Sequence, residues 1–251
     1  MAGLLLSVVV SVGWLPTALG APHESVESLI IDGARQRLLV VVDDRQPASR
    51  VLVIFSGGDG HLGLTDTPPL AGGGYVSTLR RDFVWPGTAL VLVDSPARHP
   101  SMSVEYRESA EHEAWVQSLF AGLSGRFAGV KFYAVGYSNG AVTALVAGRL
   151  RAVAGVVLVG GIFRRYADLA AFGVDVPLLV IHHEKDRCVP PDFDEAFRRV
   201  LKPTIVRFSA QSYDEAPCGP VSAHQFYAQE GAVADVVHGW LDTGRAPLRT
   251  R

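Results

Sequence analysis

The chain has 251 residues, of which 48% are hydrophobic, and this length and composition allow one sizeable hydrophobic core. Its formal net charge is −2 and its longest basic clusters are arginine pairs, so nucleic acid is not an expected partner. No repeat, low-complexity segment or long Pro/Gly/Ser linker divides the sequence. We therefore expect a single domain over residues 21–251.

Residues 1–20 are predicted to be a signal peptide. They contain no charged side chain, and they carry an apolar block over residues 4–10 and small residues at Ala18 and Gly20. The usual lysine or arginine near the start is missing, so an uncleaved anchor and a misplaced start codon are the alternatives. Because the apolar block is short for a membrane span, we expect a secreted or periplasmic protein without a stable span after cleavage.

Apolar runs of strand length recur along the chain, and several are continuous, as buried parallel strands require. The first, around Ser28 to Ile31, is joined to the second by Asp32-Gly33, which is typical of a hairpin turn. The further runs lie at 37–42, 50–56, 88–94, 130–135, 155–159, 176–182 and 204–209. Helices are expected at 75–81, 103–121, 141–150, 193–200 and 226–241. This alternation predicts an α/β fold with a mostly parallel, doubly wound sheet and an antiparallel N-terminal hairpin.

The most informative motif is Gly136-Tyr137-Ser138-Asn139-Gly140, in which a serine stands between two glycines. A strand-like run precedes it and a run of small residues typical of a helix follows it. Ser138 is therefore expected on the sharp turn between strand and helix, which is the context of a nucleophile elbow. Glycines on either side allow the strand and the helix to approach each other. The motif predicts an enzyme, and chance occurrence among 26 glycines is the alternative.

With this elbow, the chain resembles the α/β-hydrolase family over nearly all of its mature length. The resemblance implies the chain order serine, acid, histidine. The segment 178–190 looks like the family's acid loop, which makes Asp186 the expected acid and Glu184 the alternative. Only about 15 residues separate the runs that end at Gly160 and begin at Val176, which is too few for an inserted cap domain. We expect an open site, covered at most by short loops such as 65–74.

The base of the same triad is expected on a loop between the last strand and the last helix. His224 falls there, although Gln225 replaces the glycine of the family's common His-Gly-Phe pattern. His238 is the alternative, but its surroundings predict the middle of the closing helix. An imidazole is needed because it takes the proton of the serine hydroxyl, while a carboxylate fixes and stabilises the imidazole. The resemblance therefore assigns Ser138, Asp186 and His224 as the catalytic residues.

Acyl transfer also needs donors aimed at the oxygen on which negative charge develops. The resemblance implies the backbone N–H groups of Asn139 and Gly58, with Asp59 as the alternative to Gly58. The glycine run at 56–61 lacks the lysine and the spacing of a phosphate-binding Walker loop.

Candidate substrate contacts lie near the proposed nucleophile and on the glycine run. They are Tyr137, Asp59 and His61. Apolar residues at Leu62, Leu64 and Phe163 are further candidates for the lining of a pocket. Neither spacing nor composition identifies the acyl group or the alcohol.

The two cysteines, Cys188 and Cys218, are predicted to form a disulfide. An even count in an exported chain favours a bridge, and each cysteine lies close to a proposed catalytic residue. Two unrelated buried thiols are the alternative. The adjacent His182 and His183 would point to opposite faces of a strand, so no metal or other cofactor is expected.

Together these residues predict a serine hydrolase that cleaves small-molecule carboxylic esters through an acyl-enzyme. An amidase or an acyltransferase would use the same triad. A different class, a hydrolase-like binding protein of the cell envelope with little or no catalysis, is the second hypothesis, because this fold carries many unrelated activities.

Overall fold

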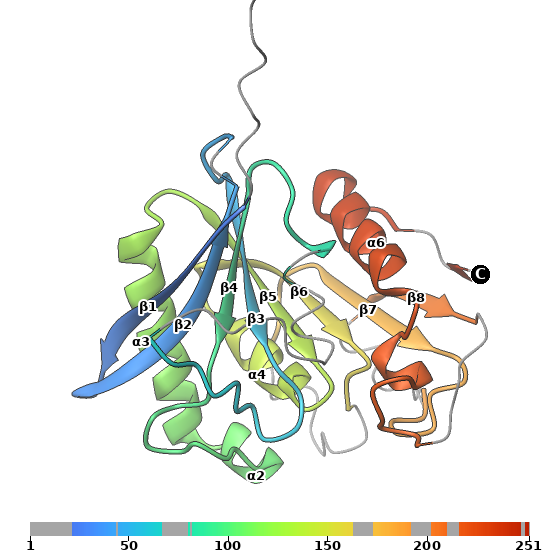
Figure 1. Ribbon diagram of the computed structural model, residues 1–251, viewed down its shortest axis with the longest axis horizontal. Coiled ribbons are helices and arrows are strands. Elements are labelled where there is room, and N and C mark those ends of the chain that lie inside the picture. The colour runs from blue at the N-terminus through green and yellow to red at the C-terminus, as the bar shows by residue number, and fades with distance from the viewer. Residues whose placement is uncertain are drawn as a thin grey trace, which may run out of the picture.

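The computed structural model describes residues 22–43, 45–66, 80, 82–162, 173–191, 202–209, 216–246 and 249–250. Within these ranges the chain forms a nine-stranded sheet in the order β1-β2-β4-β3-β5-β6-β7-β8-β9. Its strands are β1 (His23–Ile31), β2 (Ala34–Val42), β3 (Arg50–Phe55), β4 (Thr88–Val93), β5 (Lys131–Tyr137), β6 (Val153–Val159), β7 (Leu178–His183), β8 (Thr204–Phe208) and β9 (Arg249–Thr250). Figure 1 shows the twist of this sheet.

The sheet is antiparallel at its start and parallel afterwards, which confirms the predicted fold class. Strands β1 and β2 are joined at Asp32 and Gly33, whose φ angles of 50° and 75° fit a two-residue hairpin turn. Strand β2 pairs antiparallel with β4, whereas every pair from β4 to β9 is parallel. The short β9 was not expected from the sequence.

The helix expected over 103–121 is instead two helices, α2 (Val104–Arg107) and α3 (Ala110–Arg126). Each begins at its own serine N-cap, because the Ser103 hydroxyl accepts from the N–H of Tyr106 and the Ser109 hydroxyl accepts from the N–H of His112. The apolar pattern alone predicts one continuous helix, and the cap at Ser109 divides it into two.

Two other helices differ at their ends from the sequence prediction. Helix α4 (Gly140–Ala147) ends before Leu150, with Gly148 as its C-cap. Helix α6 (Glu230–Thr243) begins four residues after Phe226, because Phe226 and Ala228 have φ angles of 51° and 60° and so cannot continue a right-handed helix. The expected helices at 75–81 and 193–200 and the covering loop at 65–74 lie largely outside the described residues, as does Phe163.

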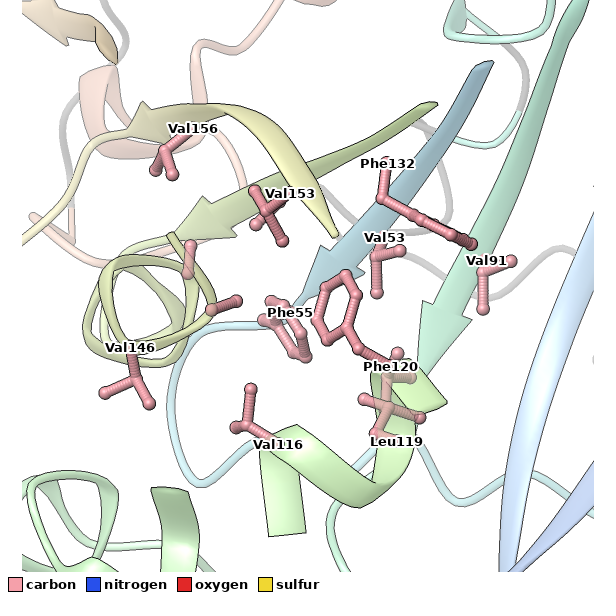
Figure 2. Packing of buried hydrophobic residues seen from close by; sticks show 14 of the residues in the cluster. Val53, Phe55, Val91, Val116, Leu119, Phe120, Phe132, Val146, Val153 and Val156 are labelled. Carbon is pink, nitrogen blue, oxygen red and sulfur yellow. The ribbon is translucent and has the colours of Figure 1, made fainter. Parts of the chain in front are cut away.

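The core has two layers, one on each face of the sheet. Successive side chains of β3 point to opposite layers. Val53 and Phe55 pack toward α3 and α4, and Ile54 packs on the face that α6 covers (Figure 1). Figure 2 shows Phe120 of α3 beside Phe55, with their ring centroids 6.5 Å apart. Among the described residues, no helix has the length and apolarity to cross a bilayer.

We expect Phe120→Ala to lower the free energy of unfolding by about 3 to 5 kcal/mol, because it removes a buried ring and leaves a cavity. Urea denaturation followed by circular dichroism measures this loss. Ile30→Thr is the matched control, because Ile30 lies on β1 with 73% of its surface exposed, and its effect should stay within about 0.5 kcal/mol. An equal loss in both variants would contradict the assignment of Phe120 to the core.

Candidate active site

Ser138 lies in the sharp turn between β5 and α4. Its φ angle is +51°, in the left-handed region that a non-glycine residue rarely adopts. A Cβ atom on Gly136 would lie 2.5 Å from the carbonyl oxygen of Gly140, and one on Gly140 would lie 2.2 Å from the carbonyl oxygen of Phe55. Both clashes are with backbone, so only glycine fits at these positions. The strand and the helix therefore approach closely enough to hold Ser138 at the end of the turn.

The glycine loop after β3 packs directly against this elbow. A Cβ atom on Gly57 would lie 2.8 Å from the Cβ atom of Ser138. The Asn139 side-chain amide donates a hydrogen bond of 3.0 Å to the carbonyl oxygen of Gly58, which ties the loop to the elbow. In the described part of the chain, the backbone N–H groups of Gly58 and Asn139 donate to no protein acceptor. Both N–H groups are thus left available for a bound molecule.

Asp186 follows β7 and is almost fully buried. Its Oδ1 accepts from the N–H groups of Cys188 and Val189, both at 2.9 Å, and its Oδ2 accepts from His224 Nδ1 at 2.8 Å. Burial, the largest single influence, raises the pKa of this carboxyl, but the hydrogen bonds from His182, His224 and the Val189 N–H, together with the charge of His224, outweigh it. The pKa of Asp186 therefore lies well below its ordinary value, and the side chain is a carboxylate at neutral pH.

His224 lies in a single 3₁₀ turn, η2 (Ala223–Gln225), and only 3% of its surface is exposed. Its ring lies against Gly160, where a Cβ atom would be 3.3 Å from His224 Cε1. Since Asp186 accepts from Nδ1, the neutral ring presents Nε2 as its proton acceptor. The structure thus brings the predicted acid and the predicted base into direct contact.

Tyr137 contacts the backbone of η2, the turn that carries His224. Its buried hydroxyl donates to the carbonyl oxygen of His224 at 3.2 Å, and it also bonds the side chain of Gln225. Burial raises the pKa of this hydroxyl well above its usual range, so it stays a neutral donor. Gln225, the departure from the family's glycine, therefore takes part in this contact.

The two alternative residues lie apart from this pair. Glu184 is exposed, and its N–H donates to the carbonyl oxygen of Phe208 at 2.7 Å. His238 is partly exposed on α6, where it pairs with Asp242 at 3.0 Å and packs edge-on against Trp85. Neither contacts Asp186 or His224 among the described residues.

Asp59 and His61 lie on the far part of the glycine loop. The Asp59 carboxylate accepts from the N–H of His61 at 3.0 Å, and the His61 ring is half exposed beside Ser95. Sequence analysis did not identify Asp94, which organises this loop from the end of β4. Its carboxylate accepts from the N–H groups of Leu62 and Leu64 at 2.7 and 2.8 Å, which fixes the loop's path.

His182 and His183 have separate partners. His182 Nε2 donates to the carbonyl oxygen of Val189 at 2.7 Å and lies 3.3 Å from Asp186 Oδ2. His183 Nδ1 accepts from the N–H of Lys185 at 3.1 Å. His182 therefore belongs to the surroundings of the acid, a contact that spacing along the chain did not indicate.

Cys188 and Cys218 form a disulfide that closes a loop with a sequence separation of 30 residues, which confirms the predicted bridge. Cys188 stands two residues after Asp186, and Cys218 stands six residues before His224. The bridge therefore joins the loop that carries the predicted acid to the segment that leads into the predicted base.

No family model and no curated protein matches this sequence. Solved structures do match. An alpha-beta serine hydrolase homologue from Coxiella burnetii superposes with a TM-score of 0.61 at 15% identity, over 84% of this chain and 94% of its own. A serine hydrolase without a lid from Xanthomonas campestris gives 0.60 at 17% identity, over 90% of this chain and 97% of its own. The dienelactone hydrolase from Anabaena variabilis gives 0.62 at 18% identity, over 88% and 97%.

The chain has the α/β-hydrolase fold. In this fold the elbow serine stands at the top of the sheet, and the acid and the histidine follow it in the sequence. The positions of Ser138, Asp186 and His224 along this chain match that order.

We expect Asp186→Asn to be less stable than the wild type at pH 7, with a difference that shrinks at acid pH. The pKa of Asp186 is lower in the folded protein than in the unfolded chain. The ionised side chain therefore stabilises the fold at pH values above its unfolded pKa of about 3.9, and this stabilisation is lost as the pH falls through its folded pKa. Urea midpoints at pH 7, 5 and 3 measure this. Glu184→Gln, in an exposed position of the same loop, should have little effect at pH 7, and a pH-independent loss in Asp186→Asn would contradict the linkage.

Replacing both cysteines with serine should lower the free energy of unfolding by about 3.5 kcal/mol, because the bridge restricts a long loop in the unfolded chain. Urea denaturation of the oxidised wild type and of Cys188→Ser/Cys218→Ser measures the difference. The wild type with dithiothreitol is the control and should approach the double variant. Labelling of both thiols by iodoacetamide in unfolded, unreduced protein would show that the bridge does not form.

Proposed function

We propose that this protein is a serine hydrolase that cleaves small-molecule carboxylic esters through an acyl-enzyme. The observation that carries the proposal is the 2.8 Å contact between Asp186 and His224 in a chain whose elbow serine has a strained, positive φ angle. The similar structures include a serine hydrolase without a lid and a dienelactone hydrolase, which supports a hydrolytic activity.

In the first step, Ser138 Oγ attacks the carbonyl carbon of the ester while its proton passes to His224 Nε2. Asp186 remains ionised and stabilises the imidazolium that forms. The carbonyl oxygen becomes an oxyanion, which accepts hydrogen bonds from the N–H groups of Gly58 and Asn139. When the tetrahedral intermediate collapses, the bond to the alcohol breaks and the alcohol leaves with the proton from His224.

Water completes the reaction at the same groups. His224 takes a proton from the water as its oxygen attacks the acyl carbon, and the second oxyanion occupies the same two donors. Collapse of this intermediate breaks the bond to Ser138 Oγ, which regains its proton from His224. The products are a carboxylic acid and the restored enzyme.

We further propose that Asp59 and His61 contact the substrate. Both lie on the exposed part of the glycine loop, beyond the proposed donor Gly58. Tyr137 has a different part in this proposal, because its buried hydroxyl is engaged by the turn that carries His224. It would contact the substrate through the edge of its ring and shape the base side of the site.

Export is part of the proposal. The disulfide between Cys188 and Cys218 suits an oxidising compartment, and the segment over residues 1–20, which lies outside the described residues, has the composition of a signal peptide. The mature enzyme would then be one domain over residues 21–251.

We expect a fluorophosphonate probe to add one adduct to the wild type and none to Ser138→Ala, because only an activated serine reacts rapidly. Intact-mass spectrometry measures the adduct. His224→Gln should slow labelling by at least about 1000-fold, whereas the matched variant His238→Gln should label at the wild-type rate. Folded wild type that forms no adduct would overturn the proposal and favour the binding-protein hypothesis.

A further inference from the structure

A wholly buried arginine lies beneath the glycine loop that we propose as half of the oxyanion site. Arg107 is the last residue of α2, and none of its surface is exposed. Its Nη2 donates to the carbonyl oxygens of Gly58 at 3.4 Å and Ser56 at 3.5 Å. Its Nη1 donates to the hydroxyl of Thr143 at 2.8 Å, in the first turn of α4. One guanidinium thus links the loop after β3 to the helix that follows Ser138.

The Gly58 carbonyl is held by two donors that come from different elements. The Asn139 side-chain amide reaches it from the elbow at 3.0 Å, and Arg107 reaches it from α2. A carbonyl oxygen has two lone pairs, so these bonds fill its acceptor capacity. Since Gly57 and Gly58 have no side chains to restrict the backbone, these bonds supply the orientation that the residues themselves lack.

The loop is also shaped around the guanidinium. Gly60 has a φ angle of +82°, and a Cβ atom there would lie 2.8 Å from Arg107 Nη2 and 2.2 Å from the methyl carbon of Met102. A side chain at residue 60 would therefore overlap the guanidinium of Arg107. The glycine at residue 60 thus allows the loop to cover Arg107 and contributes to the burial of the guanidinium.

A neutral histidine completes the network. His112 Nε2 lies 3.0 Å from the Thr143 hydroxyl, which also accepts from Arg107. Burial, followed by the charge of Arg107, lowers the pKa of His112 to about 3. The hydroxyl therefore accepts from the guanidinium and shares a second hydrogen bond with the neutral imidazole, and Thr143 holds Arg107 in one orientation.

The geometry points to Arg107 as a positioning residue for the oxyanion site: it binds the carbonyls of Ser56 and Gly58, on either side of the peptide group that carries the Gly58 N–H, and places a buried positive charge behind that group. This inference rests on the proposed function. A charge held at a fixed place in a water-poor site stabilises a developing oxyanion more than the same charge does in water. Arg107 acts through the loop, because its hydrogen bonds to Gly58, Ser56 and Thr143 hold the loop after β3 against α4.

The test is the rate at which a fluorophosphonate labels folded Arg107→Met, measured over a range of probe concentrations. The limiting first-order rate should fall about 10- to 100-fold, while the half-saturating concentration stays within about threefold, because the loss falls on the transition state. Arg107→Lys keeps the positive charge but loses the planar guanidinium, so its limiting rate should lie between those of Arg107→Met and the wild type. A purely structural arginine would change the urea midpoint and leave the limiting rate of the folded protein unaltered.

Arg80→Met is the matched control. Arg80 is also a largely buried arginine, but it pairs with Glu24 of β1 at 3.3 Å, beside the amino end of β4 and away from Ser138. Its removal should lower stability without changing the labelling rate. An equal fall in the rate of Arg80→Met and Arg107→Met would overturn the inference.

A double-mutant cycle with Asn139→Ala tests the shared carbonyl. Because Arg107 and Asn139 both bind Gly58, their effects on the limiting rate should be non-additive, and additive effects would count against the inference. If Arg107→Met does not fold, Thr143→Val removes the anchor of the guanidinium on α4 and should slow labelling about threefold or more. An unchanged rate in Thr143→Val would then reject the positioning role.

The two proposals fail in different ways. Folded wild type that is not labelled would contradict the serine hydrolase itself. Rapid, Ser138-dependent labelling that persists at the full rate in folded Arg107→Met would leave the hydrolase in place and reject only the role of Arg107.

Discussion

The site depends on one close backbone contact, that between the first residue of α4 and the end of β3. Gly140 lies so near the carbonyl oxygen of Phe55 that no side chain fits between them. This approach brings the loop after β3 beside the turn after β5, and it forces Ser138 into a left-handed conformation. The cost of that conformation is of the order of 1 to 3 kcal/mol, and the packed sheet on both sides sustains it.

The other side of the site is held by different means. Asp186 receives backbone N–H groups from its own loop and His224 from a turn 38 residues later, and the disulfide joins the same two segments covalently. The elbow side is therefore fixed by sterics, whereas the side that carries Asp186 and His224 is fixed by hydrogen bonds and a cross-link. Both sets of groups meet at the carboxyl ends of the parallel strands, where the α/β fold places its ligands.

Much of the fold was predictable because the central strands are buried on both faces and so appear as continuous apolar runs. Helix ends were predicted less well, because they depend on single residues such as the Ser109 cap and the left-handed Phe226. Ser138, Asp186 and His224 stand in recognisable local patterns. Arg107 and Asp94 do not, because the loop and helix residues that they hold lie 30 or more residues away and no spacing records those contacts.

The disulfide makes a covalent ring of the chain between Cys188 and Cys218. A single peptide-bond cut anywhere inside that ring would leave two fragments still attached to each other, one with Asp186 and the other with His224. Cleavage there would change the mass on a denaturing gel only after reduction. On the same gel, a cut outside the ring would release a piece without reduction, so the bridge decides which breaks in the backbone separate Asp186 from His224.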